Sequence, residues 1–231
     1  MLGTIVNSLA VIIGSLLGIS LKNGINDKYK NTIMDGISLA VIVIGIMSGI
    51  KSQNMVLVVV SLALGALIGE AIDVEGRLDR LANKVEARLG KGDSNFSKAF
   101  VSATLVYCIG AMAIVGALES GLTGNHQTLY AKSALDGITA IVFASTLGIG
   151  TAFSAIPILI YQGSITLLAK YIKDLLTPEL VTEMSAVGGI LIIAIGINLL
   201  NLKKIKVGNL LPAVLIPFVY YFIVNMVGNL L

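Results

Sequence analysis

Two aspartates lie at equivalent places in this sequence, and both are candidates for binding a cation or a proton. Asp35 follows Lys30 and Asp136 follows Lys132, and each lies about one turn inside an apolar run. A carboxylate within a membrane is costly unless it is paired, protonated or hydrated, so such residues commonly mark ion sites. The alternative is helix capping, because an aspartate in the first turn accepts backbone N–H bonds and suits the positive end of the helix.

A second group of candidates occupies the stretch "LDGITAIVFASTLGIGTAFSAIPILIYQGS", residues 135–164. It is too long for one membrane span of about 20 residues and has no hydrophilic break for a surface loop. Gly148, Gly150 and Pro157 can interrupt a helix, and such breaks survive at membrane depth only inside protein or beside a wet cavity. Two interpretations stay open: a broken helix that binds a solute or ion, and a tight turn with small residues for helix packing. The candidate ligands here are Ser145, Thr146, Thr151, Ser154 and Gln162.

A third polar cluster lies on "EMSAVGGILIIAIGINLLN". Asn198 is a further binding candidate, although a hydrogen bond to a neighbouring helix is its ordinary explanation. Glu183 is expected at the outer edge of the membrane, in the interfacial region.

The residues argue against enzymatic, metal and cofactor chemistry. His126 is the only histidine and Cys108 the only cysteine, so the sequence predicts no multi-histidine metal site and no intrachain disulfide. The His-Glu-x-x-His, Gly-x-Ser-x-Gly and Walker patterns are absent. The two aspartates are expected at opposite membrane faces, too far apart to share a proton as a protease dyad does. We therefore predict no enzyme, no metal and no cofactor.

The composition predicts a multi-pass membrane protein. Of 231 residues, 56% are hydrophobic and 13% are charged, against roughly a quarter charged in soluble domains. The net charge of +3 suggests no nucleic-acid partner. The predicted fold is all-α, with about eight transmembrane helices near 2–20, 32–50, 54–72, 99–118, 134–151, 153–172, 183–202 and 209–229.

Lysine and arginine collect in alternate loops, which predicts the orientation. The loops at 21–31, 73–98 and 203–206 hold most of them. Because short cytoplasmic loops are enriched in these residues, we expect both termini outside. Within the 73–98 loop, residues 74–91 show an apolar stripe at helical spacing, typical of a regulatory or dimerising helix or of a helix lying on the inner membrane surface.

The windows "YKNTIMDGISLAVI" (29–42) and "YAKSALDGITAIVF" (130–143) match at a constant offset. Each opens the second span of a three-span unit, and an odd number of spans inverts the second copy. The match predicts a 3+3 inverted repeat, a pattern typical of transporters, followed by two helices. The expected units are 1–73, a linker at 74–98, 99–173 and 174–231.

Three stretches resemble one family: "GTIVNSLAVIIGSLLG", "GTAFSAIPILIYQGSITLLA" and "EMSAVGGILIIAIGINLLNLKKIKVGNLLPA". They are similar to domain-of-unknown-function family 554, the YdfK/YqgA-like group, over nearly the whole chain. The resemblance implies a protein of the prokaryotic inner membrane and supplies no substrate.

The expected function is gradient-driven transport or channelling of a small solute or ion by a lipid-embedded protein. The alternative is a non-transporting scaffold that contacts lipid or protein. Glycine-rich faces on several spans also predict a homodimer.

Overall fold

A computed structural model describes residues 1–22, 27–78, 80, 96–108, 111–173 and 175–228. The described regular elements are all helices, which confirms the all-α class. In chain order they are α1 (Leu2–Lys22), α2 (Asp27–Gly49), α3 (Met55–Ile72), α5 (Phe96–Cys108), α6 (Ala111–Leu122), α7 (Gln127–Leu147), α8 (Gly150–Phe153), α9 (Ala155–Ile172), α10 (Pro178–Leu199), α11 (Val207–Leu210), the 3₁₀ helix η1 (Leu211–Leu215) and α12 (Ile216–Gly228).

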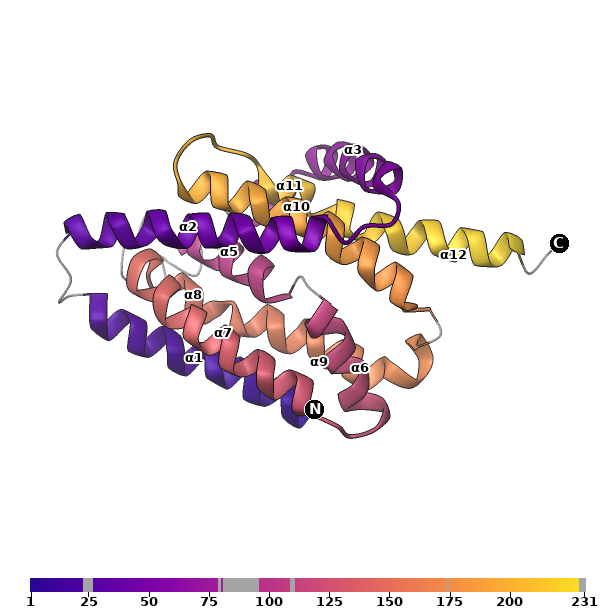
Figure 1. Ribbon diagram of the computed structural model, residues 1–231, viewed down its shortest axis with the longest axis horizontal. Coiled ribbons are helices and arrows are strands. Elements are labelled where there is room, and N and C mark those ends of the chain that lie inside the picture. Colours follow the sequence, from indigo (N-terminus) through magenta and orange to yellow (C-terminus); the bar gives the residue numbers. More distant parts are fainter. Residues whose placement is uncertain (23–26, 79, 81–95, 109–110, 174, 229–231) are drawn as a thin grey trace.

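Helices α1 and α7 pack against each other along the lower side of the molecule in Figure 1. A Cβ atom at Gly14 would clash with the backbone oxygen of Gly137, and one at Gly18 with that of Ile141. Two glycines four residues apart share a helix face and let backbones approach closely. This contact brings segments of the chain's first and second halves together.

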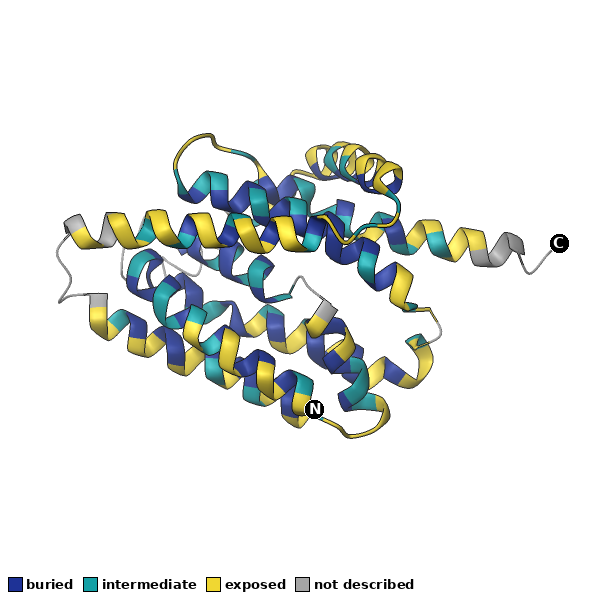
Figure 2. Ribbon diagram, viewed as in Figure 1, coloured by how far each residue is buried: buried dark blue, intermediate teal, exposed yellow. Residues whose placement is uncertain are grey.

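Helices α2 and α10 form a second glycine-mediated pair. A Cβ atom at Gly45 would lie 2.6 Å from the backbone oxygen of Gly189, and the converse distance is also 2.6 Å. Of the apolar stretch of α10, 78% of the residues are buried, against 22% for α2. Helix α10 is therefore central, whereas much of α2 is exposed (Figure 2).

The chain breaks between α7 and α9, as the glycines and hydroxyl residues predicted. Gly148 ends α7 with φ at 96°, a conformation that favours glycine. Gly150 begins α8, and a Cβ atom there would clash with the backbone oxygen of Phe96 in α5. Helix resumes at Gly150 and again at Ala155, so the prediction that Pro157 interrupts a helix is wrong. Pro157 lies in the first turn of α9, where its missing N–H leaves no helical bond unmade.

Within the described residues, six helical segments are long and apolar enough to span a membrane, or seven if α5 and α6 form one span bent by 59°. Helix α7 is not among the six, because its first half is polar and includes Lys132 and Asp136. The windows 29–42 and 130–143 fall at corresponding places near the starts of α2 and α7. The eight spans, the inverted repeat and the four-unit division stay predictions. Most of the 74–91 helix lies outside the described residues.

Candidate functional site

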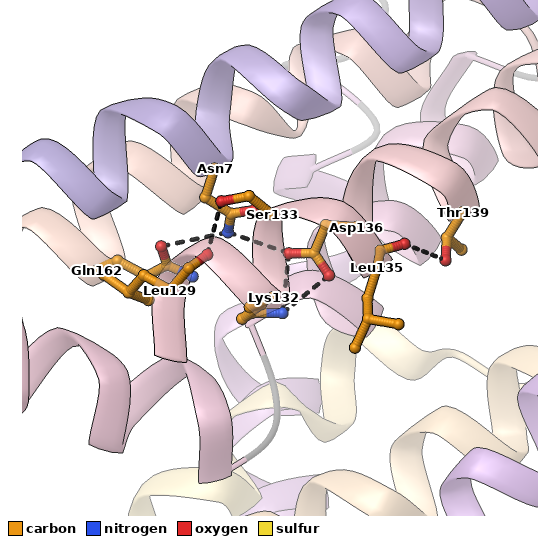
Figure 3. Close-up of polar contacts among 8 residues, drawn as sticks. All are labelled: Asn7, Leu129, Lys132, Ser133, Leu135, Asp136, Thr139 and Gln162. Atoms are coloured by element: carbon orange, nitrogen blue, oxygen red, sulfur yellow. Dashed lines mark hydrogen bonds and ion pairs between the residues drawn. The ribbon is translucent and has the colours of Figure 1, made fainter. Parts of the chain in front are cut away.

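An ion pair is buried on the inner side of α7. Asp136 Oδ1 accepts a hydrogen bond of 2.9 Å from Lys132 Nζ, and Asp136 Oδ2 lies 2.8 Å from the same Nζ in the ion pair. The two side chains are only 9% and 8% exposed. They are four residues apart on one helix, the spacing at which neighbouring turns bring side chains together. Helix geometry alone therefore forms this pair, and packing against α1 removes it from solvent (Figure 3).

Two amide side chains from other helices complete the cluster. Asn7 of α1 donates from Nδ2 to Asp136 Oδ2 at 3.0 Å and to Gln162 Oε1 at 3.3 Å. Asn7 and Gln162 are both fully buried. Figure 3 shows the resulting chain of contacts from Lys132 through Asp136 and Asn7 to Gln162. Three helices, α1, α7 and α9, thus supply a polar cluster within an otherwise apolar bundle.

The cluster leaves hydrogen-bonding capacity unused. Asn7 Oδ1 and Gln162 Nε2 are buried and have no partner among the described residues. The two amides cannot simply be turned over, because Asn7 must present its NH₂ group to the carboxylate of Asp136. The buried hydroxyl of Tyr107 in α5 also lacks a described partner. An unsatisfied buried polar group costs about 1–3 kcal/mol, so these atoms favour a bound water or polar solute.

Nearby hydroxyl groups bond mainly to their own helix. Ser133 donates to Leu129 O at 2.6 Å and Thr139 to Leu135 O at 2.7 Å (Figure 3). Their polarity is therefore internally satisfied, which distinguishes them from the amides. The ligands that remain are one carboxylate, one ammonium, one amide acceptor and one amide donor. Within the described residues, no three His, Cys, Asp or Glu side chains are grouped to hold a metal ion.

The two predicted aspartates have different environments. Asp136 is buried in the cluster, whereas Asp35 is exposed on α2 and joins no part of it. The capping interpretation is wrong for both, because α2 begins at Asp27 and α7 at Gln127. Each aspartate lies in a helix interior, beyond the first turn where N–H groups are free. The helices extend into the polar residues that precede each apolar run.

The hydroxyl residues at the helix break are used locally. Ser145 and Thr146 donate to Val142 O, at 2.8 Å and 2.9 Å, and Ser154 donates to Thr151 O at 2.6 Å. Thr151 is fully buried and its hydroxyl has no described partner. Of the candidates predicted in this stretch, Gln162 alone hydrogen-bonds to the Asp136 cluster within the described part of the chain.

Asn198 fastens the connection that follows α10. Its Nδ2 donates to Ile205 O and its Oδ1 accepts from Ile205 N, both at 2.8 Å. The expected partner was a neighbouring helix, and the actual partner is backbone seven residues further along the chain. These two hydrogen bonds resemble those between paired strands. They explain the role of Asn198 without a bound ligand.

Sequence reasoning missed the contacts made by three polar residues. Asn7 lies in an apolar amino-terminal run, and Lys132 was read only as the charge that precedes the apolar stretch. The four-residue spacing between Lys132 and Asp136 could have indicated that the two side chains form an ion pair. Glu183, expected at the outer edge of the membrane, is only 1% exposed. Its carboxylate accepts from Ser52 Oγ at 2.6 Å and from the backbone N–H groups of Gln53 and Asn54, so it holds the α2–α3 turn.

The apolar helices and the buried polar cluster define a polytopic helical membrane protein. The chain belongs to the family described as "Protein of unknown function (DUF554)", which matches residues 2–222. It is similar to the "Uncharacterized membrane protein YdfK" of Bacillus subtilis (strain 168), with 38% identity over 99% of each chain. It is also similar to the "Uncharacterized protein YqgA" of Escherichia coli (strain K12), with 33% identity over 93% of this chain and 94% of that protein. No solved structure matches the chain.

Proposed function

We propose that this protein is a gradient-driven transporter or channel for a small solute or ion, and that the Asn7–Lys132–Asp136–Gln162 cluster is its binding site. The observation that carries the proposal is the buried ion pair of Lys132 and Asp136 beside amide atoms that lack described partners. Ionisable residues within membrane helices are rare and commonly belong to an ion or proton pathway.

The energetics favour a functional reason for the pair. Burying two charges costs several kcal/mol per ion before their attraction is counted, and an apolar pair of similar volume is often as stable or more stable. A purely structural contact between α1 and α7 needs only the glycines that already let the backbones touch. The charges therefore do not serve helix packing alone.

The side chains of the cluster suit an exchange of the positive charge that compensates Asp136. Lys132 compensates the charge of Asp136 while the site is empty. A proton or cation arriving at Asp136 would replace Lys132 as the compensating charge and release its ammonium group. Asn7 Oδ1 offers an acceptor and Gln162 Nε2 a donor to a polar solute or to the hydration water of an ion. The net charge of the empty cluster is zero, which suits a site that must bind and release its ligand.

The alternative function is a scaffold that contacts lipid or another protein. It is favoured by the exposure of α2, on which Asp35 is exposed and Gly36 has open space around it. A scaffold needs no movement of charge across the membrane. The two functions therefore differ in one measurable property, the current driven by an ion gradient.

The test measures charge displacement in reconstituted proteoliposomes under gradients of H⁺, Na⁺, K⁺ and Cl⁻. We expect a signal from the wild-type protein above that of protein-free vesicles under at least one gradient. Asp136→Asn should abolish it, because the amide cannot carry the charge. Asp35→Asn is the matched control, since it makes the same chemical change at an exposed carboxylate and should retain the signal. Wild-type signals equal to protein-free vesicles under all four gradients, or an undiminished Asp136→Asn signal, would refute the proposal.

A further inference from the structure

A pocket of about 400 Å³ opens at the end of the molecule opposite the amino terminus of α10. It lies where the residues after α3, the start of α5 and the connection from α10 to α11 meet. The buried cluster of Asn7 and Asp136 contributes no residue to it. The pocket is therefore a separate place in the fold.

Most of the charged residues that line this pocket are basic. Lys98 of α5 and Lys203 and Lys204 of the α10–α11 connection line it, with Glu75 as the carboxylate among the described lining residues. The Glu75 carboxylate already accepts a hydrogen bond of 2.6 Å from the backbone N–H of Gly208. Lys203 and Lys204 are exposed, and no hydrogen bond or ion pair engages either in the described structure. The uncompensated charge in the pocket is positive.

Two further polar groups lie beside these lysines. Lys98 uses one of its three N–H donors on Asn201 Oδ1, at 3.3 Å, which turns its ammonium toward Asn201 at the pocket lining. Ser102 lines the pocket, is only 6% exposed, and has no hydrogen-bond partner for its hydroxyl among the described residues. Its hydroxyl lines the same pocket as the lysines and can donate a hydrogen bond to a bound oxyanion.

We propose that this pocket binds a phosphate group. Phosphate presents several charged oxygens at once, which suits ammonium groups that converge from two separate segments and a hydroxyl donor beside them. The group has two possible sources, a free phosphate or the headgroup of an anionic phospholipid. Leu202 is 74% exposed next to Lys203, a placement that allows an acyl chain to lie along it. Basic pockets at the ends of membrane helices commonly hold lipid headgroups.

The experiment compares two double variants of the full-length protein in detergent. Lys203→Gln with Lys204→Gln removes two charges from the pocket. Lys170→Gln with Lys173→Gln is the control, because it removes the same charge from exposed lysines at the end of α9, away from the pocket. Native mass spectrometry counts bound phosphatidylglycerol and phosphatidylcholine, and titration calorimetry measures binding of inorganic phosphate. Thermal unfolding of both variants confirms that they are folded.

We expect the pocket variant to weaken binding of the probe that the wild-type protein binds, phosphatidylglycerol or inorganic phosphate, by roughly tenfold or more, since each lysine beside an anionic headgroup contributes about a fivefold attraction. The control should change it by less than about twofold. Preferential binding of phosphatidylglycerol without inorganic phosphate would assign the lipid as the source, and binding of inorganic phosphate would assign the free ion. The proposal is overturned if the wild-type protein binds neither probe, or if the pocket and control variants weaken binding equally. A transport defect would leave this result unaffected, because neither readout requires transport.

Discussion

At the residue scale, two aspartates that occupy equivalent places in the sequence have different surroundings in the structure. Asp136 has Lys132 four residues earlier, and Asn7 reaches it from another helix. Asp35 has Asn31 at the corresponding position and remains exposed. The chemistry of a carboxylate in a membrane protein is therefore set by what packs on its helix, because its charge must be compensated within a few ångströms.

The ion pair makes a prediction about stability. Lys132→Met should lower the free energy of unfolding by about 3–5 kcal/mol, because it leaves the Asp136 charge buried without its counter-ion. Lys132→Met combined with Asp136→Leu should restore most of that loss, since the remaining groups are apolar and similar in volume. Chemical unfolding in detergent micelles measures both.

The double variant also separates structure from transport. It should unfold near the wild-type midpoint and still carry no charge in proteoliposomes. A double variant that is as unstable as Lys132→Met would show that the pair stabilises the fold beyond charge compensation. A stable double variant that transports normally would show that the pair has no part in transport.

At the element scale, glycine positions decide which helices meet. The α1–α7 contact places Gly14 against the backbone of Gly137, and the α2–α10 contact places Gly45 against Gly189. These contacts position the site, because Asn7 reaches Asp136 only if α1 lies close along α7. The helix break at Gly148 then directs α9 back alongside α1, which brings Gln162 to Asn7.

The α1–α7 contact can be tested with two substitutions at one interface. Gly14→Ala should lower the free energy of unfolding by roughly 1–3 kcal/mol, because its Cβ atom would clash with the backbone oxygen of Gly137. Gly137→Ala is the matched control, since its Cβ atom would lie 3.4 Å from Ala10, an ordinary contact. It should leave stability unchanged or raise it by up to about 1 kcal/mol through helix propensity. Equal losses in thermal unfolding would contradict the assignment of Gly14 to the tight contact.

At the scale of the whole molecule, different segments of the chain lie at the two ends of α10. Ser52 contacts Glu183 near the start of α10, and the lysine-bearing connection at 201–206 follows its other end. Helix α12 extends away from the bundle (Figure 1), and α2 and α12 have much of their surface exposed (Figure 2). The homodimer stays a prediction.

The orientation in the membrane is testable by single-cysteine labelling in a Cys108→Ala background. With both termini outside the cell, Lys51→Cys should react with a membrane-impermeant maleimide added to intact cells. Leu202→Cys should react only after the inner membrane is permeabilised, because it lies beside the basic 203–206 segment expected in the cytoplasm. Labelling of Leu202→Cys but not Lys51→Cys in intact cells would reverse the predicted topology.

The sequence by itself determined the class of this protein, because hydrophobic content and the length of apolar runs depend on no contact between distant residues. The break near Gly148 was predictable for a similar reason, since glycine's backbone freedom is a local property. The family was also evident from stretches of the chain alone.

The tertiary structure decided which polar residues matter together. Asn7 could not be predicted as a ligand from the sequence, because its partner Asp136 lies on a helix far along the chain. Glu183 became a buried anchor because Ser52 and two backbone N–H groups converge on it. A local pattern gives the polarity of a residue, whereas the compensation of its charge depends on helices that packing alone brings together.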